Sequence, residues 1–234
     1  MGFLQDAIKV FKKKDITFLE KRKEAEDVYS FLFQKDPEVT WNAGQHGLFR
    51  ITHRKVKTAI LPFTVASAPS EPVIQITTKI RPESGDFKKA LLELEPGMKV
   101  QLSGPVGPFR LHGDSPALLI AGGIGITPFR AMLKQLEAEG GRGRQPIRLL
   151  YMDSGKTYIF QDELNEISGR GTAEIVYLDT RDGLQQEIGR FVSQYDNAKY
   201  YIAGPKSMIQ DVAAHLQSKA VTKKNILKDE FFGY

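Results

Sequence analysis

LLIAGGIGITP, residues 118–128, is an apolar run that passes through three glycines into a helix continuing through Ala131, Met132 and Leu136. The order predicts a buried strand, a tight turn and a helix. Glycines let a backbone approach a pyrophosphate, and the N–H groups at a helix start stabilise negative charge. Pro128 suits the first helical turn, because proline has no N–H to leave unpaired. The stretch therefore predicts a dinucleotide-binding turn, with a βα turn that holds no ligand as the alternative.

The same alternation of apolar strands and amphipathic helices fills the rest of the second half. The expected strands cover residues 117–121, 147–151, 173–178 and 199–202, and the helices between them begin near Thr127, Phe160, Leu184 and Ser207. Residues 226–234 could add an edge strand. This pattern predicts a doubly wound α/β domain with a parallel sheet.

A second glycine turn, Ala203-Gly204-Pro205, again follows an apolar strand and precedes a helix start. In open α/β sheets, ligands bind beyond the carboxyl ends of the strands. Two such turns at one sheet edge favour a binding site more than either does alone. The alternative for the second is a strand terminator with Met208 in the core.

The first half has a different pattern, with short β-like runs punctuated by Gly and Pro at residues 28–33, 47–52, 73–80 and 99–102. Such a pattern predicts an antiparallel β-barrel. One helix is expected over residues 86–94, where Phe87, Leu91 and Leu94 recur at helical spacing. We place the domain boundary near residue 113, giving domains of residues 1–112 and 113–234.

Composition narrows the functional class. The chain has 234 residues, 41% of them hydrophobic and 26% charged, and no stretch approaches the ~18 apolar residues of a membrane span. No secretion signal is recognised, so a cytoplasmic protein is expected. Residues 1–14 are expected to form a helix or tail; a weak membrane-surface helix is the alternative, with apolar residues at Phe3, Leu4, Ile8 and Phe11.

The absence of cysteine excludes disulfides and iron–sulfur clusters held by thiolates. A net charge of +5 favours anionic partners. The basic residues are scattered without an aromatic-interleaved stripe, so no nucleic-acid partner is expected. We also expect no metal site, because the four histidines are isolated in the sequence: His46, His53, His112 and His215.

Four motifs in one order carry a resemblance to the ferredoxin–NADP reductase superfamily, whose patterns are R-x-[YF]-[ST], G-P-x-G-x-F, G-G-x-G-x-x-P and C-G-P-x-x-M. Here they read LPFT from Leu61, GPVGPF from Gly104, GGIGITP from Gly122 and AGPKSM from Ala203. The resemblance covers about residues 15–234. It implies a flavin-binding barrel followed by a domain for NADH or NADPH.

The resemblance also implies roles for matching residues. Phe63 would pack against the isoalloxazine ring of FAD, and the Thr64 hydroxyl would face flavin N5, which accepts hydride. Val65 and Ser67 would lie near the flavin, although a strand-end cap is the alternative for Ser67. The segment Gly85-Asp86-Phe87-Lys88 would meet the flavin phosphates. The dinucleotide would be held by Gly122, Gly123, Gly125, Thr127, Pro128, Ala203, Gly204, Pro205 and Met208.

The C-terminal sequence EFFGY, from Glu230, looks like the aromatic tails of bacterial members. The resemblance implies that Phe232 or Tyr234 covers the flavin face and swings aside during turnover. Glu230 would be a polar group close to the reaction centre, with a solvated charge as the alternative. For the tail as a whole, the alternative is an edge strand with a buried Phe pair.

Two positions depart from the family. Leu61 replaces the arginine that usually binds a flavin phosphate. The candidate substitutes for this arginine are Lys79, Arg81 and Lys88. FAD remains the expected cofactor, with FMN or a loosely bound flavin as the alternative. Ala203 replaces the family's cysteine, which should leave hydride transfer possible.

Asp153 bears on the choice between NADH and NADPH. Its carboxylate would repel a 2′-phosphate and accept a hydrogen bond from a ribose hydroxyl, which favours NADH. Three cations could reverse this preference: Lys156, Arg148 and Arg181.

The predicted function is a flavoprotein oxidoreductase that takes hydride from NADH or NADPH and passes electrons to an acceptor protein or a small oxidant. Orientation would dominate catalysis, so no acid–base pair is required. Two alternatives stay open. One is a flavin- or nucleotide-binding module without catalysis, and the other is a structural subunit of a larger electron-transfer complex.

Overall fold

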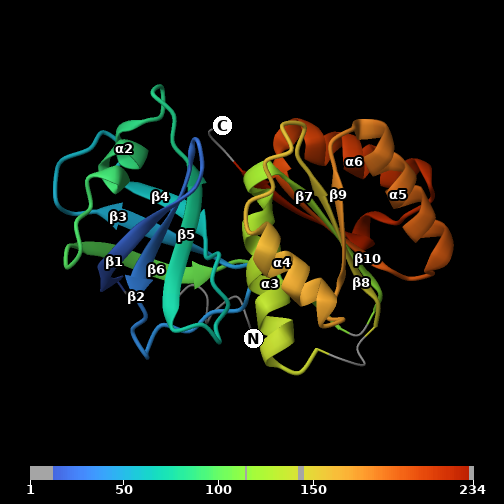
Figure 1. Cartoon of the computed structure of the whole chain (residues 1–234), viewed down its shortest axis with the longest axis horizontal. Coiled ribbons are helices and arrows are strands. Elements are labelled where there is room, and N and C mark those ends of the chain that lie inside the picture. The colour runs from blue at the N-terminus through green and yellow to red at the C-terminus, as the bar shows by residue number, and fades with distance from the viewer. Residues whose placement is uncertain (1–12, 114, 142–144, 232–234) are drawn as a thin grey trace. The chain divides into compact units, whose positions relative to one another are not determined.

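A computed structural model describes residues 13–113, 115–141 and 145–231, and the chain divides into two compact units, residues 1–110 and 111–234 (Figure 1). From residue 13 onward, the first unit holds six strands and one helix: β1 (Lys13–Ala25), β2 (Val28–Gln34), β3 (His46–Ile51), β4 (Ile60–Thr64), β5 (Val73–Lys79), α2 (Asp86–Leu92) and β6 (Lys99–Val106). All of the strand pairings described in this unit are antiparallel. They give the strand order β4-β3-β6-β1-β2-β5.

The long strand β1 joins the two halves of this sheet. Its first residues pair with β6 and its later residues pair with β2. Beyond β4, the N–H of Ala66 donates to the carbonyl of Gln75 on β5 at 2.7 Å, so the two end strands are linked where the chain crosses between them. The core lies inside, around Phe31, Phe33 and Phe49. The predicted antiparallel barrel is confirmed.

The second unit alternates strands with helices: β7 (Ala117–Gly122), α3 (Ile126–Ala138), β8 (Ile147–Met152), α4 (Gln161–Gly169), β9 (Glu174–Leu178), α5 (Arg181–Gln194), β10 (Lys199–Pro205), α6 (Lys206–Ser218) and β11 (Ile226–Phe231). Two short 3₁₀ turns, Gly123–Gly125 and Lys223–Asn225, precede α3 and β11. The sheet is parallel with the order β11-β10-β7-β8-β9. This confirms the predicted doubly wound fold.

The helices cover both faces of this sheet. Figure 1 shows α3 and α4 on one face and α5 and α6 on the other. Strand β7 is buried along its whole length, as expected for a central parallel strand between two helical layers. On the α5 and α6 face, Leu118 and Ile120 pack with Ile188 and Ile209 in one apolar cluster.

The structure differs from the sequence prediction at two element starts. Lys13 and Lys14, expected in a helix or tail, open β1, and residues 1–12 lie outside the described residues. Ile16 and Phe18 alone are buried in β1. The alternating apolar pattern that marks a half-buried strand is therefore short. Helix α5 begins at Arg181 and not near Leu184, because the Thr180 hydroxyl caps it by accepting the N–H of Gly183 at 3.2 Å.

No helix in the described part of the chain is long and apolar enough to cross a membrane.

Candidate functional site: two glycine turns and a flavin-type strand

The strand order places a topological switch point beside β7. From β7 the chain adds β8 and β9 on one side, and it then crosses to add β10 and β11 on the other. Ligands of open α/β sheets bind where the order reverses, beyond the carboxyl ends of the strands. In this unit those ends are Gly122 on β7 and Pro205 on β10, which are the two turns that the sequence singles out.

The two turns touch through their backbones. A Cβ built on Gly125 would lie 2.5 Å from the carbonyl carbon of Ala203 and 2.8 Å from the Cα of Gly204. Gly204 has φ +147°, and a Cβ there would lie 3.0 Å from the carbonyl oxygen of Gly122. Side chains at these positions would separate the turns, so glycine is required for the close approach.

The side chains of the second turn also close on the first. A Cβ on Gly122 would lie 2.8 Å from Cε of Met208 and 3.2 Å from Cδ of Pro205. Met208 therefore packs against the end of β7. The structure brings together six of the residues expected at the dinucleotide site: Gly122, Gly125, Ala203, Gly204, Pro205 and Met208.

The other predicted residues of this edge lie around the turn. The hydroxyl of Thr127, in the first turn of α3 with Pro128, donates to the carbonyl of Ile124 at 3.2 Å. This side chain braces the turn from within. Asp153 follows β8, and a Cβ on Gly123 would lie 3.7 Å from its Oδ2, while its Oδ1 accepts the N–H of Gly155 at 2.9 Å.

The C-terminal strand adds two carboxylates beside β10. In the parallel register, Asp229 pairs with Ala203 and Glu230 pairs with Gly204, so Glu230 lies next to the second turn. Burial raises the pKa of Asp229 to about 6. Phe232 and Tyr234, the predicted flavin-covering residues, lie outside the described residues.

In the first unit, Phe63 and Thr64 end the edge strand β4. The Phe63 ring is half-buried and packs edge-on against Phe49, with ring centroids 5.9 Å apart, and against Phe87 of α2 at 5.7 Å. The Phe63 ring therefore lies against both β3 and α2. The start of α2 is the segment predicted to meet the flavin phosphates. Leu61, which replaces the family's arginine, packs against the barrel core.

Three cations were expected to replace that arginine, and the structure brings two of them together at α2. Burial lowers the pKa of Lys88, and the positive charge of Arg81 lowers it further. Arg81 also pairs with Asp27 at 2.8 Å. Lys79 ends β5, and its charge helps to lower the pKa of Asp27, after the hydrogen bond from Arg81.

The start of α2 has open space beside it. Gly85 caps the helix with ordinary φ, and a Cβ there would meet no atom within 4 Å. Asp86 is exposed, while Phe87 is buried in the core. Two nearby cations and an unfilled helix start fit an anionic group such as a flavin phosphate.

Val65 and Ser67 follow β4 and are buried. The Ser67 hydroxyl accepts the N–H of Gln75 at 2.9 Å, and its carbonyl accepts the indole N–H of Trp41 at 3.3 Å. Ser67 thus ties the segment after β4 to β5.

A pocket of about 220 Å³ between α5 and α6 escaped the sequence prediction. Its floor is apolar and includes Met152, at the end of β8, and Met208, which also packs against Gly122. Arg181, Asp211 and His215 contribute polar groups. The pocket forms from two helices separated by a strand, so no local motif could reveal it.

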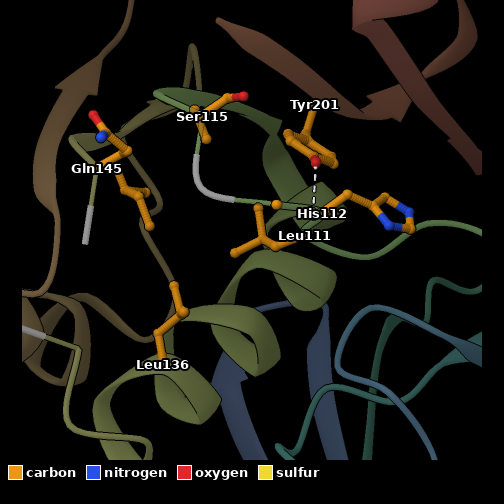
Figure 2. A pocket seen from close by; sticks show the side chains of 9 residues that line it. Leu111, His112, Ser115, Leu136, Gln145 and Tyr201 are labelled. Carbon is orange, nitrogen blue, oxygen red and sulfur yellow. Dashed lines mark hydrogen bonds between the residues drawn. The ribbon is translucent and has the colours of Figure 1, made fainter.

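A smaller pocket of about 30 Å³ lies where β7 and β8 begin, at the opposite edge of the sheet from the glycine turns (Figure 2). The Tyr201 hydroxyl points to the backbone of His112 and accepts its N–H at 3.0 Å. This space suits about one water molecule. It is too small for a dinucleotide.

Comparison with known proteins gives the same assignment for the second unit. Residues 119–214 match the family described as the oxidoreductase NAD-binding domain. A flavohemoprotein of Rhodopirellula baltica is 25% identical over 91% of this chain, and the toluate 1,2-dioxygenase electron transfer component of Pseudomonas putida is 28% identical over 58%. The matches span 59% and 43% of those two proteins, so this chain covers about half the length of these relatives.

The fold comparison extends over both units. The crystal structure of a ferredoxin NADP⁺ reductase from Neisseria gonorrhoeae with bound FAD and NADP matches 94% of this chain and 99% of that one. Its TM-score is 0.80 at 16% sequence identity. The two chains share a fold from the barrel through the parallel sheet.

Proposed function

We propose that the chain is an NAD(P)H-dependent flavoprotein reductase of the ferredoxin–NADP reductase superfamily. The match of residues 119–214 to the NAD-binding domain of oxidoreductases and the shared fold with a ferredoxin NADP⁺ reductase support this proposal. Residues 1–112 would hold the flavin and residues 113–234 the dinucleotide. The acceptor is an electron-acceptor protein or a small oxidant.

The observation that carries this proposal is the contact between the two glycine turns at the switch point. Gly122 and Gly125 bring the turn after β7 against Ala203 and Gly204, at the strand ends where such sheets bind ligands. The pyrophosphate would lie on the N–H groups before α3. The second turn would border the nicotinamide, with Glu230 beside it.

The flavin fits the first unit on separate grounds. Phe63 presents a half-buried ring at an edge strand, and Thr64 follows it with a hydroxyl for flavin N5. Lys88 and Arg81 supply positive charge at the start of α2, where Gly85 leaves space. Lys88 would take the place of the arginine that Leu61 replaces, with Arg81 nearby but paired with Asp27, and FAD is the proposed cofactor.

When bound, the flavin supplies an acceptor for hydride from nicotinamide C4 and a store for electrons. The chain would orient the two ring systems and exclude water, which is where most of the rate enhancement of such a reaction comes from. No general acid or base is needed for hydride transfer itself. The residues of both glycine turns are therefore binding and positioning groups.

NADH is the proposed donor. Asp153 lies beside Gly123, where its carboxylate could accept a bond from a ribose hydroxyl and would repel a 2′-phosphate. The cations that could attract this phosphate are paired: Lys156 with Asp179 at 2.8 Å, Arg148 with Glu174 at 2.7 Å, and Arg181 with Asp211 at 2.9 Å.

An anaerobic titration of the purified, FAD-supplemented protein tests this function. NADH should bleach the flavin absorbance band, and NADPH should do so more slowly. A demonstrably bound flavin that neither dinucleotide reduces would overturn the proposal in favour of a binding module without catalysis. Failure to bind any flavin would overturn the assignment of the first unit.

A further inference from the structure

His46, the first residue of β3, lies where two of the four sequence motifs meet. In the antiparallel register it is opposite Thr64 on β4 and opposite Val106 on β6. Thr64 ends the LPFT motif, and Gly107, which follows Val106, belongs to the GPVGPF motif. The strand pairing thus places a titratable side chain between these motifs, although the histidine is isolated in the sequence.

The imidazole ring of His46 packs against Gly107. A Cβ built on Gly107 would lie 3.1 Å from both Nδ1 and Cε1 of the ring. Gly107 also has φ +122°, so a side chain there would crowd the imidazole and strain the backbone. The turn therefore holds the ring along its Nδ1–Cε1 edge.

The side chains of His46 and Thr64 are within reach of one another. Directly opposite residues of an antiparallel pair point to the same face of the sheet, with Cβ atoms about 4.5–5.5 Å apart. That separation allows a hydrogen bond between a hydroxyl and an imidazole. Within the described part of the chain, neither side chain is committed to another hydrogen-bond partner.

His46 has the surroundings of a proton acceptor. It is half-buried, and burial lowers the pKa of its imidazole. Its neighbours on β4 and at the end of β6 are Thr64, Val106 and Gly107, which carry no charge. The ring is therefore neutral at neutral pH, and its remaining exposure lets a proton pass to solvent.

The proposed reaction leaves a proton to be removed at this place. Hydride brings one proton and two electrons to flavin N5, and an acceptor that takes electrons alone leaves the proton behind. Thr64 Oγ1 would accept this proton from N5 and give its own proton to a nitrogen of His46. The imidazolium would then release a proton to solvent, so that both side chains return to their starting forms.

We propose that His46, acting through the Thr64 hydroxyl, accepts the proton that leaves flavin N5 when the acceptor withdraws electrons. This inference rests on the proposed function, because it requires the flavin at Thr64. It assigns His46 to the reoxidation of the flavin, whereas the glycine turns serve its reduction by the dinucleotide.

Photoreduction of the FAD-loaded full-length protein, followed by stopped-flow mixing with ferricyanide, isolates this step. Ferricyanide takes one electron at a time and no proton. The variants are His46→Gln, Thr64→Val and Thr64→Ser, of which the last keeps the hydroxyl. His53→Gln is the matched control, because His53 is another half-buried histidine of the same unit and lies beside Glu93. The flavin absorbance band verifies that each variant is loaded before mixing.

Reoxidation of the wild type should accelerate as the pH rises through the pKa of His46, because only the neutral imidazole accepts a proton. His46→Gln and Thr64→Val should slow it about a hundredfold and remove this pH dependence. Thr64→Ser and His53→Gln should keep both the rate and the profile. An unchanged rate or pH profile in His46→Gln, or equal rates in the two Thr64 variants, would overturn the inference.

An equilibrium measurement adds a readout that does not depend on turnover. NMR titration of the histidine rings, with FAD oxidised and then photoreduced, should give a higher pKa for His46 in the reduced protein, because reduced flavin brings a negative charge. His53 should titrate alike in both states. A His46 pKa that ignores the flavin would overturn the inference. Light replaces NADH in both experiments, so failure here is distinguishable from failure of NADH to bleach the flavin.

Discussion

The backbone of Gly125, before α3, lies against the carbonyl group of Ala203, near the end of β10, so closely that a Cβ on Gly125 would be 2.5 Å from the Ala203 carbonyl carbon. Two segments about 80 residues apart in the chain are thus joined without an intervening side chain. This contact fixes the spacing of the two turns at the switch point. The proposed dinucleotide site depends on it.

Gly125→Ala should therefore damage the unit and its binding edge. The added methyl group has only backbone to displace, so we expect a loss of about 1–3 kcal/mol in the free energy of unfolding and a weaker affinity for NADH. Gly169→Ala is the control, because a Cβ at the end of α4 meets no atom within 4 Å. Denaturant unfolding and NADH binding would be measured on both. Equal stability and affinity of the two variants would contradict this close approach.

Lys88 should contribute to flavin affinity through its charge. Lys88→Gln should weaken FAD binding about tenfold, the usual size of one charge-assisted hydrogen bond, and the exposed neighbour Lys89→Gln should not. Fluorescence titration of FAD measures both. If the two variants weaken FAD binding equally, general electrostatics and not a phosphate contact is responsible.

The pH dependence of FAD affinity gives a second check on Lys88. Its pKa is lowered by burial and by Arg81, so it loses its proton at a lower pH than an ordinary lysine. FAD affinity should therefore fall as the pH rises through that lowered pKa. Lys88→Arg should flatten the profile, because a guanidinium stays charged. A wild-type profile that already matches Lys88→Arg would exclude Lys88 as a ligand.

These tests begin from residues that the sequence could place. The sequence pattern of strand, turn and helix located both glycine turns. It could do so because a tight turn and a helix start each depend on a few neighbouring residues. The same reasoning could not find the pocket between α5 and α6, where Arg181 meets Asp211 only after β10 has crossed to the other side of β7. It also missed the start of β1, since Ile16 and Phe18 alone are buried in that strand.

The role of individual hydroxyls was equally hidden. Thr127 and Ser67 have residue types suited to ligand binding, but Thr127 donates to Ile124 and Ser67 accepts the N–H of Gln75. Which of several polar partners a hydroxyl takes is decided by distances of a few tenths of an ångström. Sequence spacing does not contain that information.

Tyr201 should stabilise the second unit through the N–H of His112 (Figure 2). Tyr201→Phe removes the acceptor and should lower the free energy of unfolding by about 0.5–1.5 kcal/mol. The His112 amide should also exchange faster with deuterium. Tyr195→Phe is the control, because its hydroxyl accepts an exposed hydrogen bond from the Gln194 amide. Unchanged exchange at His112 in Tyr201→Phe would show that the bond is not maintained.

Asp229 should make the protein less stable as the pH rises. Burial raises its folded pKa to about 6, above the ~3.9 of an unfolded aspartate, so the folded state binds more protons between these values. Stability then falls from about pH 4 to about pH 6 and stays lower above. Asp229→Asn should gain about 3 kcal/mol at pH 8 and little at pH 4. A gain independent of pH would point to packing and not to charge.

The central claim is that a dinucleotide on the two glycine turns gives hydride to a flavin on the barrel. Anaerobic stopped-flow reduction of the FAD-loaded protein by NADH deuterated at nicotinamide C4 tests it most directly. We predict that flavin bleaching slows with deuterium on one face of C4 and not on the other, because a fixed nicotinamide transfers only one of its two hydrogens. Bleaching at the same rate with every label, or no bleaching of a bound flavin, would contradict the claim.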